Sequence, residues 1–317
     1  MYKLLMVGGG IGGLTAALAC ARRGANVELF ERAAGFTEVG AGIQLGPNVV
    51  KLLQGWGLNS ALADVAAYPE CLQVRCAITG AVLGVSRLGK VFEKRYGAPY
   101  ISIHRADLQA LLLAAVRQEA AVSLHVNSPA SSFSQSDDSV NLHLSDFHEV
   151  QGDALVGADG GWIRIRQLLL GDGVPRPTGH LAYRAMVDQA GLPEGLRSQQ
   201  VTAWLGPKLH LVQYPVRGGR WLNVVAIVHG QVQGDMSHWD HSANAQDLRR
   251  NMADTCSPLQ DLVGAIGQWR LWPLSIRPPM GGAHEHAKGR VALLGDAAHP
   301  MVPYLAHGAG MAIEDAS

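Results

Sequence analysis

A glycine pattern near the start of the chain constrains its fold more than any other feature. Gly8, Gly10 and Gly13 form G-x-G-x-x-G between the apolar run YKLLMV and the helix-forming run LTAALACARR. An apolar run that ends at glycine is typical of a buried parallel strand, and the segment NVELF at 26–30 returns to strand character. The pattern therefore predicts a β-α-β unit whose helix N-terminus holds the pyrophosphate of a dinucleotide.

An acidic residue at the end of the second strand strengthens this prediction. Glu31 follows the glycines near the roughly 20-residue spacing at which a carboxylate accepts hydrogen bonds from an adenosine ribose. Strand, turn, helix and acid together favour a nucleotide site over a glycine-rich turn that binds nothing. They leave open whether the dinucleotide is NAD(P) or FAD.

The rest of the chain changes texture once. Helices are expected from Pro47 to about Trp56 and over 107–118, and residues 179–229 then alternate apolar and polar positions between Gly and Pro, as an antiparallel sheet would. After a polar, helical stretch, RVALLGD at 290–296 is another buried parallel strand. We therefore expect an α/β protein with two domains. A discontinuous nucleotide-binding domain of 1–178 and 279–317 has a mostly parallel sheet, and a smaller α+β substrate domain of 179–278 is built on an antiparallel sheet.

Composition excludes several classes of protein. The 317 residues carry 26 basic and 26 acidic side chains, which removes any broad electrostatic case for nucleic acid or an anionic membrane, and 48% apolar residues suffice for a buried core. Four cysteines without C-x-x-C spacing are expected to be reduced thiols, and the apolar run after Lys3 is too short for a secretory signal. No run of about 18 apolar residues predicts a membrane span. We expect a cytoplasmic protein whose partner is a small molecule.

Two later motifs identify the dinucleotide by resemblance. GADGGWIRIR at 157–166 resembles the Asp-Gly motif, and GRVALLGDAAHP at 289–300 the Gly-Asp motif, of single-component FAD-dependent aromatic hydroxylases. With IHRADLQ at 103–109 and HGAGMAIEDA at 307–316, the resemblance spans the chain, most closely the branch of salicylate, 3-hydroxybenzoate and 6-hydroxynicotinate hydroxylases. It implies a Rossmann-like FAD-binding domain and hydroxylation of a phenolic aromatic acid of the hydroxybenzoate type. NADH or NADPH and O2 would be consumed, through a flavin C4a-hydroperoxide.

The resemblance also implies which residues bind the cofactor. Arg105 approaches the flavin chain, Asp296 accepts hydrogen bonds from the ribityl hydroxyls, and a helix beginning near Gly308 directs its N–H groups at the flavin. Asp159 and Arg166 serve FAD and the nicotinamide cofactor, with a buried salt bridge holding a loop as the alternative. The full set of cofactor-binding residues that we expect is Gly8, Gly10, Gly13, Glu31, Arg32, Arg105, Asp159, Arg166, Asp296, Pro300, Gly308 and Ala309.

The chain departs from the family at three places. Family members often carry Ser where this chain has Ile163 and Gln where it has His307. The chain ends at Ser317, inside the helix after the Gly-Asp motif, whereas relatives continue with further helices. On this basis we expect a C-terminally truncated FAD-binding domain.

The candidate catalytic residues lie in the second domain. In LHLVQYPV, His210 and Tyr214 are four apart, so both side chains point to the same face of a strand. The pair resembles the substrate-activating His and Tyr of 3-hydroxybenzoate and 6-hydroxynicotinate hydroxylases. Removing a phenolic proton enriches the ring for electrophilic oxygen transfer, and a histidine is a suitable base. The alternative is a sheet histidine bound to a backbone carbonyl beside a packed tyrosine.

Further candidates concern the substrate itself. Arg184 is suited to a substrate carboxylate or to the nicotinamide cofactor, with an exposed strand arginine as the alternative. Pro303 and Tyr304 are expected to shape the wall beside the flavin. His299, inside the Gly-Asp motif, is expected to have a structural or flavin-proximal role rather than that of a base.

Alternative functions remain open at this point. The same fold could oxygenate a non-phenolic substrate, as an epoxidase or a purine hydroxylase does, or serve as a non-catalytic flavin-binding module, and a plain NAD(P)-dependent dehydrogenase ranks third. His238-x-x-His241 and His284-x-His286 have short spacings but no third ligand, so we expect no metal site. No G-x-S-x-G motif indicates a serine hydrolase. The ring, the position hydroxylated and the choice between NADH and NADPH stay undetermined, and a homodimer is left open.

Overall fold

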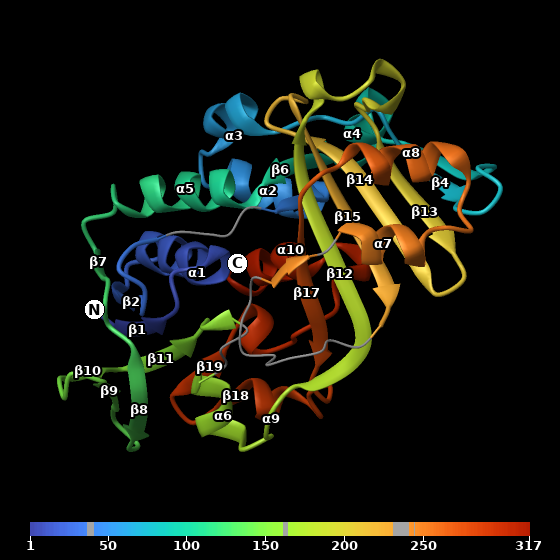
Figure 1. Cartoon of the computed structure of the whole chain (residues 1–317). Helices are drawn as coiled ribbons and strands as arrows, with labels where there is room; N and C mark the ends of the chain where they lie inside the picture. The colour runs from blue at the N-terminus through green and yellow to red at the C-terminus, as the bar shows by residue number, and fades with distance from the viewer. Residues whose placement is uncertain (37–40, 161–163, 231–240, 244) are drawn as a thin grey trace.

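The fold consists of a parallel sheet with helices and a larger antiparallel sheet beside it (Figure 1). The computed structural model describes residues 1–36, 41–160, 164–230, 241–243 and 245–317, and it describes the strand 241–243 by its backbone only. The prediction of an α/β protein with a mostly parallel sheet next to an antiparallel one is confirmed.

The parallel sheet has six strands, of which only the edge strand β18 runs antiparallel to its neighbour. In spatial order the strands are β18 (Ala287–Lys288), β19 (Val291–Leu293), β11 (Ala154–Gly157), β1 (Lys3–Val7), β2 (Asn26–Phe30) and β7 (Val122–His125). The apolar runs that predicted β1, β2 and β19 therefore pair in one sheet. Because β11 lies between β1 and β19, segments far apart in the sequence complete this sheet.

Both faces of the parallel sheet are covered, which explains the continuous apolar runs. Met6 packs with α1 (Ile11–Arg22), α5 (Arg105–Val116) and α10 (Gly308–Asp315) on one face. Leu5, one residue earlier, packs on the other face with Val140 and Leu142 of a three-stranded meander and with α6. The meander consists of β8 (Ala130–Gln135), β9 (Val140–Leu144) and β10 (Glu149–Gly152), and α6 spans Arg164–Leu170.

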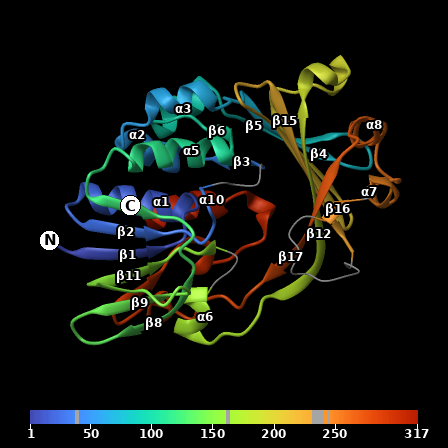
Figure 2. The ribbon, with the colours of Figure 1, turned by 60° about the vertical axis from the view of Figure 1, so that its left-hand side comes forward.

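The larger sheet has eight strands, and all its neighbours pair antiparallel except β13 and β4. In spatial order they are β16 (His241–Ala243), β17 (Trp269–Ile276), β12 (Arg176–Asp188), β15 (Trp221–His229), β14 (Leu209–Val216), β13 (Val201–Gly206), β4 (Cys71–Cys76) and β5 (Val82–Arg87). Figure 2 shows this sheet nearly edge-on. One face carries α7 (Ala245–Asn251) and α8 (Ser257–Ala265), and the other faces the parallel-sheet domain.

Two strands of the larger sheet come from an unexpected part of the chain. β4 and β5 lie within 1–178, which the sequence assigned to the nucleotide-binding domain, yet β4 pairs with β13. All six residues of β4 are half-buried and all six of β5 are exposed, so neither strand has the alternating apolar pattern by which a strand is predicted. The chain therefore enters the larger sheet twice.

A two-stranded ribbon joins the two halves. It pairs β3 (Gly42–Leu45) with β6 (Ile101–His104). The Gly42 N–H donates to Asn223 Oδ1 at 2.7 Å, and the Ser102 hydroxyl donates to the Pro215 carbonyl at 2.5 Å. A Cβ on Gly42 would lie 2.5 Å from the Tyr214 ring, so glycine is required for this close approach. The ribbon therefore holds β14 and β15 in a defined position against the first domain.

The remaining helices surround these sheets. The helix expected from Pro47 is confirmed as α2, and α5 begins two residues before its expected start. Their bounds, with those of the short helices, are α2 (Pro47–Gly55), α3 (Asn59–Val65), α4 (Lys90–Tyr96) and α9 (Ala283–His286). No helix among the described residues is long and apolar enough to cross a membrane.

Candidate active site

The glycine turn connects β1 to α1 with very little space around it. Gly8 has a φ of +111°, and a Cβ on Gly13 would lie 1.9 Å from the Gly8 carbonyl oxygen, so only glycine permits this packing of helix against strand. Gly10 is the N-cap of α1 and supplies no side-chain hydrogen bond to the first turn. The N–H groups at this helix end are therefore suited to an anionic ligand.

Glu31 accepts backbone hydrogen bonds that stabilise the glycine turn. Its Oε2 accepts the Gly9 N–H at 2.7 Å, and its Oε1 accepts the Ala33 N–H at 2.8 Å. Each carboxylate oxygen has a further lone pair, so these bonds fix the carboxylate without exhausting its capacity to accept hydrogen bonds from a ribose. Arg32, the next residue, is close enough to Asp159 to oppose the rise in the pKa of that carboxyl.

Asp159 and Arg166 do not form the salt bridge considered as their alternative role. Asp159 Oδ2 accepts the Ile165 N–H at 3.0 Å, and burial raises its pKa. Arg166, 2% exposed, pairs with Asp172 at 2.7 Å and donates to the Ala298 carbonyl at 2.7 Å. The sequence motif contains Asp159 and Arg166 but not Asp172, so it did not indicate that Asp172 is the ion-pair partner of Arg166. Arg166 therefore connects α6 to the Gly-Asp motif, whereas Asp159 Oδ1 is buried without a hydrogen-bond partner among the described residues.

The Gly-Asp motif and α10 form the other side of the cofactor region. Asp296 is exposed, and its Oδ1 lies 3.8 Å from where a Cβ on Gly308 would stand. Asp315 accepts the Gly295 N–H at 2.9 Å and contacts His299 Nε2 at 2.5 Å, and this hydrogen bond raises the pKa of His299. His299 therefore holds α10 against the motif, as expected of a structural histidine. His307, the N-cap of α10, leaves the first turn without a side-chain cap.

These features fit FAD. Two uncapped helix N-termini, at Gly10 and His307, offer N–H groups to a pyrophosphate and to the flavin, and Asp296 is an exposed carboxylate between them. The buried, unsatisfied Asp159 Oδ1 is an acceptor for a ligand hydroxyl or N–H. Arg105 begins α5 and lies close enough to Arg184 to lower the pKa of that guanidinium. Ala309 is half-buried and packs against the core of the first domain.

His210 lines a cavity of about 380 Å³ where β14 meets the loop after β19. Its ring packs edge-on against Tyr304, with ring centroids 5.2 Å apart. Tyr304 is hydrogen-bonded to His180, and His180 stacks on His229 with centroids 4.3 Å apart. Burial, and then the nearby His180, lower the pKa of His210. The histidine is therefore neutral near pH 7 and able to accept a proton.

Tyr214 lies on the same face of β14 but has different neighbours. Four strand residues span about 13 Å, so the two side chains do not touch. The Tyr214 hydroxyl is hydrogen-bonded to Gln44, which also accepts the Tyr100 hydroxyl at 2.5 Å. Tyr214 is only 4% exposed, and burial raises the pKa of its hydroxyl. Tyr214 is therefore a proton donor rather than a base. The prediction of a shared face is confirmed.

Arg184 lies beside Tyr214 on the face directed at the first domain. Its guanidinium stands 4.9 Å from the centre of the Trp272 ring, and its Nε is buried with no hydrogen-bond partner in the described part of the chain. Burial lowers its pKa, opposed by Tyr214. Among the described residues it forms no ion pair, so Arg184 is a shielded cation and not the exposed strand arginine considered above.

The loop after β19 covers this face of the sheet. Val302 and Tyr304 pack against Ile227 and Trp272, and Pro300 and Pro303 are half-buried in the same loop. In both views α10 and this loop lie between the two sheets (Figures 1 and 2). His210, Tyr304 and Arg184 thus lie at the same face of the eight-stranded sheet. This face is directed at the domain that contains Asp296.

Sequence reasoning missed four residues of this region. His180 and His229 are register partners on β12 and β15, and His180 shares the strand parity of Arg184, a signal that could have identified it. Gln44 and Tyr100 carried no such signal, because their contact with Tyr214 depends on the ribbon. His284 and His286 lie on the short α9, and the described residues contain no group of three metal-ligating side chains. Ile163, His238 and the His241 side chain lie outside the described residues.

Comparison with known proteins gives consistent results. The profile of the family described as FAD binding domain matches residues 1–317. The 3-hydroxybenzoate 6-hydroxylase of Polaromonas naphthalenivorans (strain CJ2) is 37% identical over 313 residues, which are 98% of this chain and 76% of that protein. Klebsiella pneumoniae HpxO, solved with FAD and uric acid, has a TM-score of 0.85 and 25% identity over 99% of this chain and 78% of its own. A salicylate hydroxylase substrate complex has a TM-score of 0.83 and 26% identity over 99% and 77%.

Proposed function

The chain belongs to the FAD-binding-domain family and is a flavoprotein monooxygenase, and we propose that it hydroxylates a phenolic aromatic acid of the hydroxybenzoate type with NAD(P)H and O2. Three relatives named 3-hydroxybenzoate 6-hydroxylase, 35 to 37% identical, support this substrate class. A relative named 3-amino-4-hydroxybenzoate 2-monooxygenase, 34% identical, also acts on an aromatic acid by its name. The structure of the salicylate hydroxylase substrate complex, 26% identical in sequence, supports the same substrate class. FAD, when bound, accepts a hydride from the nicotinamide and supplies the activated oxygen atom.

The observation that carries the substrate proposal is the uncompensated cation at Arg184. A guanidinium without a counter-ion, shielded on the face that also carries His210, is suited to a carboxylate. Through the ladder, Arg184 is level with Val225 and Val212, so its row lies between those of His210 and Tyr214. Two strand spacings separate it from β14 by about 10 Å. An aromatic acid bound at this face would direct its carboxylate towards Arg184 and its hydroxyl towards His210.

The lowered pKa of His210 suits the role of base. Burial keeps the imidazole neutral, so it can accept the phenolic proton and leave an electron-rich ring. Tyr304 packs on His210 and is hydrogen-bonded to His180. These two contacts hold the loop after β19 over the cavity. Tyr214, whose pKa is raised by burial, positions the substrate as a hydrogen-bond donor.

The test is substrate-stimulated NADH oxidation by FAD-loaded protein, with products identified by mass. Hydroxybenzoates and hydroxypyridines form the panel, and 3-hydroxybenzyl alcohol, which lacks the carboxylate, is the matched control for 3-hydroxybenzoate. We expect one acid to accelerate oxidation and gain one oxygen atom, and the alcohol to be a poor substrate. If no acid on the panel stimulates oxidation, the phenolic-acid proposal is wrong.

A second candidate is oxygenation of a non-phenolic ring by the same fold. HpxO, at 25% identity, was solved with uric acid, and this favours including uric acid in the panel. In this alternative His210 only lines the cavity, so replacing it with alanine would leave turnover near normal. A non-catalytic flavin-binding module would show no stimulation by any compound.

Three further proposals rest on separate observations. Four cysteines without a disulfide, Cys20, Cys71, Cys76 and Cys256, support a cytoplasmic, reducing location, which fractionation of the source cells would test. A homodimer is tested by sedimentation. We retain the division into 1–178 with 279–317 and 179–278 as a proposal, with β4 and β5 attached to the second domain by pairing, and limited proteolysis would test it.

A further inference from the structure

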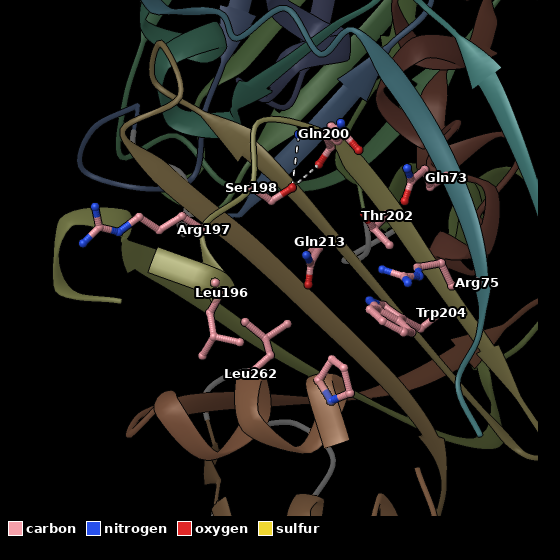
Figure 3. A pocket seen from close by; sticks show the side chains of 12 residues that line it. Gln73, Arg75, Leu196, Arg197, Ser198, Gln200, Thr202, Trp204, Gln213 and Leu262 are labelled. Atoms are coloured by element: carbon pink, nitrogen blue, oxygen red, sulfur yellow. Dashed lines mark hydrogen bonds between the residues drawn. The ribbon is translucent and has the colours of Figure 1, made fainter. Parts of the chain in front are cut away.

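A second cavity lies on the opposite face of the eight-stranded sheet, under α8 and the turn Glu194–Leu196 (Figure 3). Its volume is about 180 Å³. Strand parity separates it from the first cavity, because Gln213 precedes Tyr214 on β14 and the two side chains point to opposite faces. The lining residues that bear on ligand binding are Arg75, Leu196, Trp204, Gln213 and Leu262.

Polar side chains line up across three strands at this point. Gln73 of β4, Thr202 of β13 and Gln213 of β14 are register partners, and Arg75 pairs with Trp204 in a parallel row. Farther along the same face, towards β15 and β12, the side chains are apolar and buried against α7 and α8. A polar group of this kind inside an apolar face needs partners, because a buried polar atom without one costs free energy.

Two of these buried side chains have unsatisfied polar atoms. Gln213 Oε1 and Trp204 Nε1 have no hydrogen-bond partner in the part of the chain that the structure describes, although their residues are only 8% and 4% exposed. One is an acceptor and the other a donor, and they belong to neighbouring rows of adjacent strands. The cavity therefore offers one donor and one acceptor to a molecule that fills it.

Arg75 adds a positive charge. Its guanidinium lies 4.9 Å from the centre of the Trp204 ring, and its Nε donates to the Gly80 carbonyl at 3.1 Å. Within the described part of the chain it forms no ion pair. Figure 3 shows the guanidinium above the indole and directed towards Gln213. The charge is therefore available to an anion in the cavity.

We propose that this cavity is a binding site for a small carboxylic acid that carries a hydroxyl or amino group. The carboxylate would accept hydrogen bonds from Arg75 and Trp204 Nε1, the hydroxyl or amino group would donate to Gln213 Oε1, and the carbon skeleton would contact Leu196 and Leu262. The size is limited, since drug-sized ligands occupy roughly 300–1,000 Å³. The site is independent of the hydroxylation proposed above.

The experiment follows Trp204 directly. The chain has seven tryptophans, so FAD-loaded protein labelled with 5-fluorotryptophan gives a small set of fluorine NMR signals, and Trp204→Phe assigns the one from the cavity. Without NAD(P)H, the protein is titrated with 3-hydroxybenzoate, with the smaller 3-hydroxypropanoate, and with the carboxamide of each. We expect a saturable shift of the Trp204 signal with at least one acid, and binding of its carboxamide at least tenfold weaker.

Variants separate this cavity from the first one. Arg75→Gln is expected to weaken the acid at least tenfold in the Trp204 titration, whereas Arg184→Met, on the other face, is expected to leave that titration unchanged. The acid and carboxamide comparison needs no variant, so it decides even if Arg75→Gln fails to fold. The proposal is overturned if neither acid shifts the Trp204 signal saturably, or if acid and carboxamide bind equally. The hydroxylation proposal is judged separately, by product formation.

Discussion

Replacing Arg184 with methionine should make the ligand-free protein more stable and the substrate-bound protein harder to form. Methionine retains most of the apolar bulk of the arginine stem but removes a shielded cation that has no ion-pair partner among the described residues. Since burial lowers the pKa of Arg184, the folded protein holds this charge at a cost. Function, and not stability, would then account for its presence.

The magnitude combines two opposing contributions. Replacing buried ionic groups by apolar ones of similar volume often stabilises a protein by about 1–4 kcal/mol. Loss of the contact with Trp272 costs about 1–2 kcal/mol. The middle of each range leaves a net gain of about 1 kcal/mol, which raises the melting temperature of a chain of 317 residues by about 1–2 °C.

The ligand effect should run the other way. Loss of charge-assisted hydrogen bonds to a carboxylate, about 2–3 kcal/mol, weakens binding about 30- to 150-fold. At a concentration of 100 times the Kd of the unaltered protein, an aromatic acid stabilises that protein by about 2.7 kcal/mol but the variant by less than about 1 kcal/mol.

Differential scanning calorimetry of FAD-loaded protein, with and without 3-hydroxybenzoate, measures both effects. Arg220→Met, at a side chain 72% exposed and paired with Asp188, is the matched control and should change neither value. A variant at Arg184 that melts below the unaltered protein without ligand, or that keeps the full ligand-induced rise, would refute the reasoning.

Three other predictions address the base, the turn and the α10 contact. His210→Ala should lower the rate of hydroxylation about 10²–10⁴-fold with FAD retained. In the unaltered protein kcat/KM should rise with pH through a pKa below 6.5, because burial lowers the pKa of His210. Stopped-flow and steady-state rates from pH 5 to 8 measure both effects, and a flat pH profile would contradict the role of His210 as the base. Gly13→Ala should abolish FAD binding and destabilise the fold by about 1–3 kcal/mol, measured by fluorescence titration and urea unfolding. Gly35→Ala, whose Cβ would meet no atom of the described residues within 4 Å, should do neither. Asp315 raises the pKa of His299 above 6.5, so the stability that this pair contributes is fully present below pH 6.5 and is lost as pH rises through the raised pKa. The urea midpoint should therefore fall over that pH window in the unaltered protein and stay level in Asp315→Asn. Equal slopes of midpoint against pH in the two proteins would count against the pair.

Much of the first domain could be predicted from sequence because its signals are local. Buried parallel strands are continuous apolar runs, and the Gly8 and Gly13 positions tolerate no side chain, so β1, α1 and β2 are recognisable in 30 residues. β5 could not be recognised, because its six residues are exposed and show no period of two. Its place in the sheet is determined by pairing with β4, which in turn pairs with a strand more than a hundred residues away.

The site divides in the same way. The shared face of His210 and Tyr214 follows from strand period and was predicted, whereas their different neighbours follow from how the ribbon and the loop after β19 reach the sheet. Arg166 was predicted to act beside Asp159, but its counter-ion Asp172 lies beyond the motif. Spacing within a motif indicates which residues are near one another and does not indicate which of them pair.

The discontinuity of the parallel sheet has a consequence for biosynthesis. β11 pairs with β1 on one side and with β19 on the other, and the Lys3 N–H donates to the Asp153 carboxylate across 150 residues of sequence. On the ribosome, β1 therefore lacks its second neighbour until the meander and β11 are made, and the other edge of β11 stays exposed while most of the second sheet is made. Val291–Leu293 and α10 follow the second sheet in the sequence, so the FAD region is assembled only after that sheet has been synthesised. Nascent chains arrested before β19 should expose an apolar strand edge and depend on chaperones, and cofactor capture should follow the synthesis of β19 and α10.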